Sequence, residues 1–240
     1  MRVISLVPSL TETLIACGIE VVGRTRFCIH PADAVKKIAV VGGTKDVDWE
    51  RCLGLKADLV LMDREENTRE MAESCPIPWH ATHVTSIASL PANLDALASR
   101  LESPALRELA AQWRELNRKP VLAAPAWDQL PGFIAWIGKP PSTAGIDRIE
   151  YMIWRNPWMA VSRQTFIGSI LERVGFDAWL KSYPTPYPEL DELEVPAAGT
   201  FYLFSSEPFP FHRYRDDLEN LGFQGAVVDG EFYSWLGSGA

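Results

Sequence analysis

Short apolar runs alternate with amphipathic segments over the first 85 residues. Apolar runs bounded by polar or glycine residues are typical of buried β-strands, and apolar positions three or four residues apart are typical of helices. Ser9 and Glu12 have the spacing of a capping box, which would open the first helix. Strands that alternate with helices predict a parallel sheet covered on both faces. The predicted strands are residues 3–7, 21–24, 57–62 and 77–84.

The pattern becomes helical after residue 85, where leucines recur at helical spacing as far as residue 117. Residues 120–145 are rich in proline and aromatic side chains, which favours an ordered insertion over a flexible linker. The alternation then restarts, with strands expected at 149–154, 200–204 and 225–229. We therefore expect four parts: an α/β lobe at 1–85, a helical bridge at 86–119, an insertion at 120–147 and a second α/β lobe at 148–240.

Charge and composition narrow the class of protein. Lys and Arg number 23 against 31 Asp and Glu, and the net charge of −8 argues against a nucleic-acid partner. No stretch approaches the ~20 apolar residues of a membrane span, so no membrane insertion is expected. The opening residues lack the apolar core of a secretory signal, which predicts a cytoplasmic protein, or a periplasmic one if a leader was omitted. The nine Trp residues are a surplus that often marks a binding surface.

The loops that follow the predicted strands carry the candidate chemistry, because ligands of parallel α/β sheets bind beyond the carboxyl ends of the strands. These loops combine aromatic and proline residues with a few polar groups, which is the composition of a cleft for a large, partly apolar ligand. The candidate ligand-binding residues are Pro8, Ser9, Phe27, His30, Glu65, Glu66, Trp154, Trp158, Glu207, Phe209, Tyr233 and Trp235.

A metal site and an acid–base catalytic site are less well supported by the sequence than a ligand-binding cleft. His30 could ligate a cobalt or iron centre, or it could hydrogen-bond a loop or a ligand substituent. Asp63, Glu65 and Glu66 could work as an acid–base pair, or they could be acidic residues that favour a helix N-terminus. The chain has no phosphate-binding loop, dinucleotide fingerprint or nucleophile elbow. We therefore expect no catalytic residue, no metal site and no enzyme activity.

Several segments resemble one family. Residues 2–13 (RVISLVPSLTET) and 53–60 (LGLKADLV) are similar to the cobalamin-binding proteins of ABC importers. The segments WRNPWM at 154–159, SSEPFPF at 205–211 and VDGEFYSWLGS at 228–238 resemble a leaderless branch of the same group. These proteins belong to the helical-backbone (class III) periplasmic binding proteins.

The resemblance implies two Rossmann-like α/β lobes with parallel sheets, joined by a long backbone helix for which residues 104–117 are the best candidate. It implies a corrinoid or another metal chelate in a cleft between the lobes, with Phe27 facing Trp154 or Trp158, and no required cofactor. Glu50 and Glu192 match the glutamates that dock on an importer permease, or they are ordinary surface charges if the protein is cytoplasmic.

Three functions stay open on the sequence. The first is a non-catalytic binding protein that acts as a carrier, scavenger or sensor. The second is a small-molecule enzyme that reuses the fold, with Glu66, His30 or Glu207 as acid–base groups. The third is the substrate-binding subunit of an ABC importer.

Overall fold

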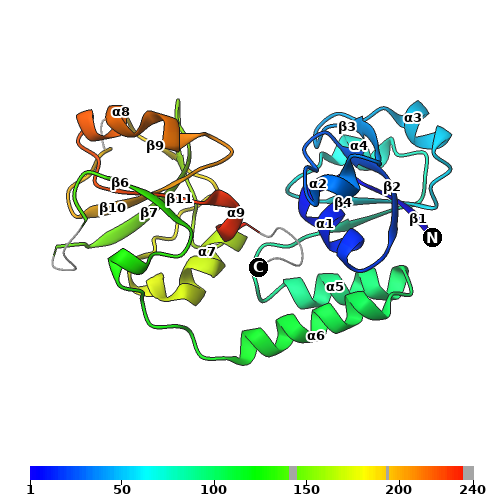
Figure 1. Ribbon diagram of the computed structural model, residues 1–240, viewed down its shortest axis with the longest axis horizontal. Coiled ribbons are helices and arrows are strands. Elements are labelled where there is room, and N and C mark those ends of the chain that lie inside the picture. The colour runs from blue at the N-terminus through cyan, green and yellow to red at the C-terminus, as the bar shows by residue number, and fades with distance from the viewer. Residues whose placement is uncertain (141–144, 193–194, 235–240) are drawn as a thin grey trace. The chain divides into compact units, whose positions relative to one another are not determined.

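The computed structural model describes residues 1–140, 145–192 and 195–234 of the chain. These residues form two compact units, Met1–Arg118 and Lys119–Ser234. Each unit is built on one β-sheet with helices packed against it (Figure 1).

The first unit holds a five-stranded sheet in the order β3-β2-β1-β4-β5. Every neighbouring pair of strands is parallel, as the alternation of strands and helices predicts. Its strands are β1 (Arg2–Ser5), β2 (Glu20–Thr25), β3 (Ala39–Gly42), β4 (Leu59–Asp63) and β5 (Trp79–Thr82). Its helices are α1 (Pro8–Ala16), α2 (Ala32–Val35), α3 (Trp49–Gly54), α4 (Arg69–Glu73), α5 (Leu90–Arg100) and α6 (Pro104–Arg118).

Local side-chain chemistry explains where several of these helices begin. The Asp48 carboxylate accepts a hydrogen bond of 3.0 Å from the Arg51 N–H and so caps α3. The capping box expected at Ser9 is wrong, because α1 already begins at Pro8 and its N-cap residue, Val7, makes no side-chain cap. Proline suits the first helical position, since it has no N–H to leave unpaired.

Both faces of the first sheet are buried. Ile4, Val60 and Met62 point to one face, where they pack with residues of α3 and α4. Val3 and Leu61 alternate with them and are equally buried. A strand that is apolar on both sides reads as a continuous apolar run, which is why the sequence showed β1 and β4 clearly.

Helices α5 and α6 form a hairpin and lie side by side in Figure 1. Leu106, Ala110 and Trp113 are the buried stripe of α6, and the Arg114 guanidinium pairs with Asp95 of α5. The helix ends at Arg118, where the first unit also ends.

The second unit has a six-stranded sheet in the order β6-β11-β10-β7-β8-β9. Its centre is parallel, because β10 pairs in parallel with both β7 and β11. The other pairings are antiparallel, so this sheet is mixed, whereas the sequence favoured parallel strands throughout.

The strands are β6 (Phe133–Ile137), β7 (Arg148–Trp154), β8 (Trp158–Ala160), β9 (Glu189–Leu190), β10 (Thr200–Ser205) and β11 (Gly225–Val228). The helices are α7 (Phe166–Leu171), α8 (Arg215–Asn220) and α9 (Gly230–Tyr233), and shorter helical turns are η1 (Trp127–Gln129), η2 (Glu172–Phe176), η3 (Asp177–Trp179) and η4 (Phe211–Tyr214).

The proline- and aromatic-rich segment at 120–147, expected as a separate insertion, contributes to this second sheet. Its strand β6 pairs with β11 along one edge. Helix α8 covers that edge, since Arg215 donates a 3.1 Å hydrogen bond to the Trp136 carbonyl and the Gly138 N–H donates one of 3.0 Å to Glu219. These bonds occupy polar groups of an edge strand that would otherwise be open to pairing.

Candidate functional site

The five strands of the first sheet are parallel, so their carboxyl ends meet at one edge, which we call the first loop edge. It consists of the loops that follow β1 to β5. The sheet order places β1 and β4 side by side, although β2 and β3 separate them in sequence. Parallel sheets bind ligands at such a change of winding direction. Pro8 and Ser9 form the first turn of α1 just after β1, and Glu65 and Glu66 lie in the loop after β4.

In the loop after β2, the side chains of Phe27, Ile29 and His30 are exposed, as is that of Arg26. Phe27 is 52 % exposed and Ile29 is 55 % exposed, so two large apolar side chains two residues apart lie open to solvent. His30 precedes a cis proline, Pro31, at the end of this loop. The expected residues Phe27 and His30 are therefore open to a ligand. Ile29 was missed from the sequence, although its place two residues after Phe27 was the available signal.

A buried thiol anchors this loop from behind. Cys28 is 1 % exposed, and its Sγ atom lies 3.1 Å from the hydroxyl oxygens of both Thr11 and Thr25. On the solvent side, the Arg26 guanidinium carbon lies 5.2 Å from the centre of the Phe27 ring, and Arg26 also pairs with Asp46. Phe27 is therefore held from two directions before any ligand arrives.

Buried polar side chains fix the loop after β4. The Asp63 carboxylate accepts hydrogen bonds from the Thr82 hydroxyl at 2.6 Å and from the backbone N–H groups of Glu65 and Val84. The Asn67 side-chain amide donates to the carbonyl of Leu6 at 3.2 Å and so ties this loop to the segment after β1. Of the two roles open for Asp63, the geometry supports the structural one, since its oxygens are occupied by groups that fix the loop.

Glu65 and Glu66 follow this anchor and differ in exposure. Glu65 is half-buried, and the Lys45 ammonium donates a 3.1 Å hydrogen bond to its carbonyl oxygen. Glu66 is partly exposed to solvent, but desolvation of its carboxylate by the surrounding protein raises its pKa. The charge of Lys45 lowers the pKa, and the charges of Asp63 and Glu65 raise it. Two carboxylates of this loop and the ammonium of Lys45, from the segment after β3, therefore lie at the first loop edge.

The second unit has a similar edge where the parallel strands β7, β10 and β11 end; we call it the second loop edge. Trp154 is the last residue of β7 and is 40 % exposed. Its ring meets that of Phe209 edge to face, with 5.6 Å between the ring centres. Phe232, in α9, is 48 % exposed at the end of β11. It was not among the candidates, because both it and the adjacent Tyr233 are aromatic and nothing in the sequence distinguishes them.

Glu207 lies in the turn after β10 and is exposed at this edge. The Ser205 hydroxyl donates to the carbonyl of Glu207 itself, and the Gly230 N–H donates to Ser206 at 3.0 Å. Gly230 is required by close approach, because a Cβ atom there would lie 2.3 Å from the Ser205 hydroxyl oxygen and 2.8 Å from the Glu207 Cγ. The turn is thus packed directly against α9.

Two expected ligand contacts are core residues instead. Trp158 is 6 % exposed and stacks on Phe211, with ring centres 6.3 Å apart and planes 5° from parallel. Tyr233 is fully buried, and its hydroxyl donates a 2.8 Å hydrogen bond to the Pro131 carbonyl. Neither ring offers a free face to a ligand. Trp235 lies outside the described residues.

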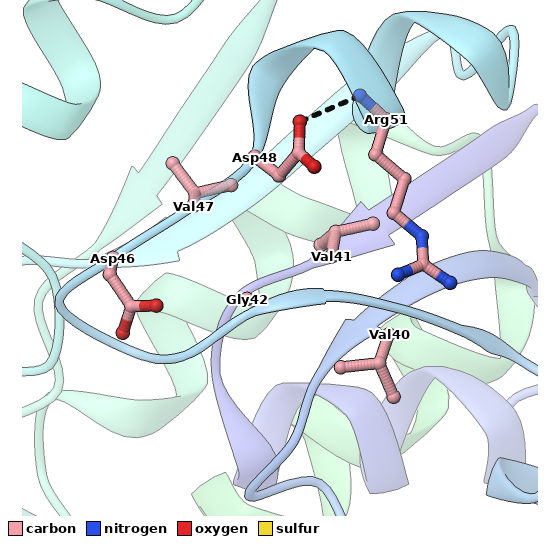
Figure 2. Close-up of a pocket in the computed structure, with 7 residues that line it drawn as sticks. All are labelled: Val40, Val41, Gly42, Asp46, Val47, Asp48 and Arg51. Carbon is pink, nitrogen blue, oxygen red and sulfur yellow. Dashed lines mark hydrogen bonds between the residues drawn. The ribbon is translucent and has the colours of Figure 1, made fainter.

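A cavity of about 380 Å³ lies beside β3 and the start of α3, and Figure 2 shows its lining. Its lining residues are Val40, Val41, Gly42, Asp46, Val47, Asp48 and Arg51. None of them is among the expected ligand-binding residues. Glu50, the expected docking residue of this unit, is exposed in the first turn of α3, next to this lining. Glu192 is exposed in the second unit.

No group of three or more His, Cys, Asp or Glu side chains within residues 1–140, 145–192 and 195–234 is arranged to hold a metal ion. In the same residues, no helix is both long enough and apolar enough to cross a membrane.

Two successive α/β units, each with exposed aromatic side chains where its parallel strands end, define a bilobal ligand-binding protein. The chain belongs to the periplasmic binding protein family, whose sequence profile matches residues 3–201. The fold class expected from the sequence, that of class III periplasmic binding proteins, is confirmed.

Relatives and solved structures agree on this assignment. The chain is 26 % identical over 199 residues to the vitamin B12-binding protein of Pectobacterium carotovorum, a match that covers 81 % of this chain and 67 % of that protein. It is 33 % identical over 115 residues to the same-named protein of Pectobacterium atrosepticum, covering 46 % of this chain but only 41 % of the relative.

Heme-complexed IsdE of S. aureus has a TM-score of 0.72 at 11 % identity, covering 98 % of this chain and 92 % of that one. The periplasmic vitamin B12-binding protein BtuF of Vibrio cholerae has a TM-score of 0.60 at 17 % identity, covering 91 % and 83 %. These two likenesses show the fold alone.

Proposed function

We propose that this chain is a non-catalytic binding protein whose ligand is a corrinoid or another metal chelate. The observation that carries the proposal is the exposure of Phe27 at the first loop edge and of Trp154, which rests on the half-buried Phe209, at the second. Large rigid rings held in place by their surroundings bind a flat macrocycle with little loss of side-chain entropy. The relatives named as vitamin B12-binding proteins support the same class of ligand.

The charges at both edges favour a corrinoid over a porphyrin. Carboxylates of Glu65 and Glu66 lie at the first loop edge, and Glu207 lies at the second. A corrinoid carries amide groups around its rim, and their N–H groups can donate to carboxylates. A heme carries propionate groups, which carboxylates repel. The net charge of −8 likewise repels an anionic heme.

The proposal is tested by calorimetric titration of the purified protein with cyanocobalamin, cobinamide and hemin at the same ionic strength. We expect saturable binding of both corrinoids, quenching of tryptophan emission and a raised unfolding temperature. We expect weaker binding of hemin. Saturable binding of hemin alone would replace the corrinoid with a porphyrin, and failure of all three would end the metal-chelate proposal.

Docking on an importer permease is the second part of the proposal. Glu50 and Glu192 are exposed acidic residues, one in each unit, and are suited to meet basic residues of a partner. We expect a Glu50→Gln, Glu192→Gln double variant to bind ligand normally and to lose binding to a permease reconstituted in lipid. The matched control is Glu108→Gln, since Glu108 is an exposed acidic residue on α6, an element that carries neither Glu50 nor Glu192.

The compartment is a further proposal. Proteins of this family are described as periplasmic, and a cytoplasmic location is the alternative. Fractionation of cells that express the protein from its own gene separates the two, since only a periplasmic protein is released by osmotic shock. A cytoplasmic result favours a carrier or sensor, and a periplasmic result favours the importer subunit.

The enzyme alternative, with Glu66, His30 or Glu207 as acid–base groups, is not favoured by the family assignment. It would be revived by turnover of a small molecule that Glu66→Gln or His30→Gln abolishes.

A further inference from the structure

Arg155 lies in the turn between β7 and β8, directly after the exposed Trp154. Its guanidinium carbon is 5.5 Å from the centre of the Trp158 ring and 5.8 Å from that of Tyr214. Its Nη1 atom lies 3.4 Å from a carboxylate oxygen of Asp217 in α8. The side chain is only 21 % exposed, so these neighbours cover most of the cation.

The two rings beneath Arg155 belong to the segments that carry the exposed Trp154 and its half-buried partner Phe209. Trp158 is in the same hairpin as Trp154, and the Tyr214 ring centre lies 5.1 Å from that of Phe209. Arg155 therefore joins the β7–β8 hairpin to the segment 209–214 behind the point where Trp154 meets Phe209. Removing this cation would take away one of the contacts between the two segments, which also meet where Trp158 stacks on Phe211, without removing either ring of the pair.

We propose that Arg155 is a positioning residue that presets the Trp154–Phe209 pair for the ligand; this inference rests on the proposed function. A planar guanidinium stacks on aromatic faces, whereas the ammonium of a lysine acts as a point charge. A wall already ordered in the free protein reduces the entropy lost on binding, so the contribution of Arg155 is to affinity rather than to the fold.

The first measurement uses the free protein. 5-Fluorotryptophan is incorporated, and the ¹⁹F resonance of Trp154 is assigned by its disappearance in Trp154→Phe. We expect Arg155→Met to shift and broaden this resonance, and Arg155→Lys to do so less. Arg163→Met is the matched control, because Arg163 pairs with Glu172 and Asp177 in the same unit and contacts no aromatic ring of the pair. An unchanged Trp154 resonance in Arg155→Met overturns the proposal.

The second measurement is the Kd for cyanocobalamin, together with the urea midpoint of each variant. We expect Arg155→Met to bind about tenfold more weakly with a nearly unchanged midpoint, and Arg155→Lys to recover part of the loss. Equal weakening by Arg163→Met, or full recovery by lysine, overturns the proposal, since the first indicates general destabilisation and the second a role for charge alone. If the wild-type protein binds no corrinoid, the proposed ligand fails, and the ¹⁹F measurement still decides the positioning role.

Discussion

The hydroxyl of Thr82 donates a 2.6 Å hydrogen bond to the Oδ2 atom of Asp63, and both residues are buried. The bond joins the carboxyl ends of β4 and β5, which are neighbours in the first sheet. Asp63 also accepts a hydrogen bond from the N–H of Glu65, so the position of the acidic loop depends on a buried carboxylate.

Replacing Thr82 tests this arrangement. We expect Thr82→Val to lower the free energy of unfolding by about 1.5–3 kcal/mol, because a buried carboxylate loses one of its donors while the shape of the residue is kept. Thr82→Ser keeps the hydroxyl and is expected to lose much less. Urea denaturation at neutral pH measures both variants. A Thr82→Val protein as stable as the wild type would show that the bond does not fix this loop.

Replacing the exposed aromatic residues should weaken ligand binding rather than lower stability. Phe27→Ala and Trp154→Ala are each expected to weaken cyanocobalamin binding by about tenfold and to leave the urea midpoint nearly unchanged, because the rings are about half exposed in the free protein. Trp79→Ala is the matched control, since Trp79 is 44 % exposed but begins β5, at the opposite end of the sheet from the first loop edge. Equal weakening in all three variants would contradict a local role for Phe27 and Trp154.

Trp158 is expected to behave as a core residue. Trp158→Ala should lower the free energy of unfolding by about 3–5 kcal/mol, because it leaves a cavity beside Phe211 and Phe223. Trp158→Phe keeps most of the packing and should cost less. Denaturant unfolding followed by circular dichroism measures both. A stable Trp158→Ala protein that fails to bind ligand would return this residue to the site.

The contrast between Trp154 and Trp158 shows where sequence reasoning reached its limit. Both residues flank one turn and were candidates because they follow a predicted strand, and the family resemblance left open which of the two meets the ligand. Strand β7 pairs with β8 through a register shift between Met152 and Trp154. A shift of one residue exchanges the two faces of a strand, so the outward-facing tryptophan cannot be identified before the register is known.

The strands also differ in how well the sequence predicted them. Strands β1 and β4 were predicted because both of their faces are apolar and buried. The short edge strand β3 was missed, since only Val41 of its four residues is buried. Strand β6 was not predicted, because prolines and glycines surround it and its segment was interpreted as an ordered insertion. Its strand character comes from pairing with the distant β11.

Glu150 provides a test by pH. Its side chain is buried on β7, and its carboxylate accepts a hydrogen bond from the Tyr183 hydroxyl. Burial raises the pKa of Glu150 above its ordinary value of 4.5, while the Tyr183 bond and the charges of Arg148 and Lys181 lower the pKa and offset part of the shift.

The folded protein therefore holds the Glu150 proton to a higher pH than the unfolded chain does. Between pH 4.5 and the raised pKa of Glu150, the folded state binds more protons, so the free energy of unfolding from this group falls as the pH rises. Glu150→Gln cannot titrate but can still accept the bond from Tyr183. We expect the difference in unfolding free energy between variant and wild type to grow in favour of the variant across that range, and urea titrations at several pH values measure it. Glu189→Gln, at an exposed position of the same unit, is the control and should show no such trend. A constant difference between Glu150→Gln and the wild type would mean that the pKa of Glu150 is the same in the folded and unfolded states.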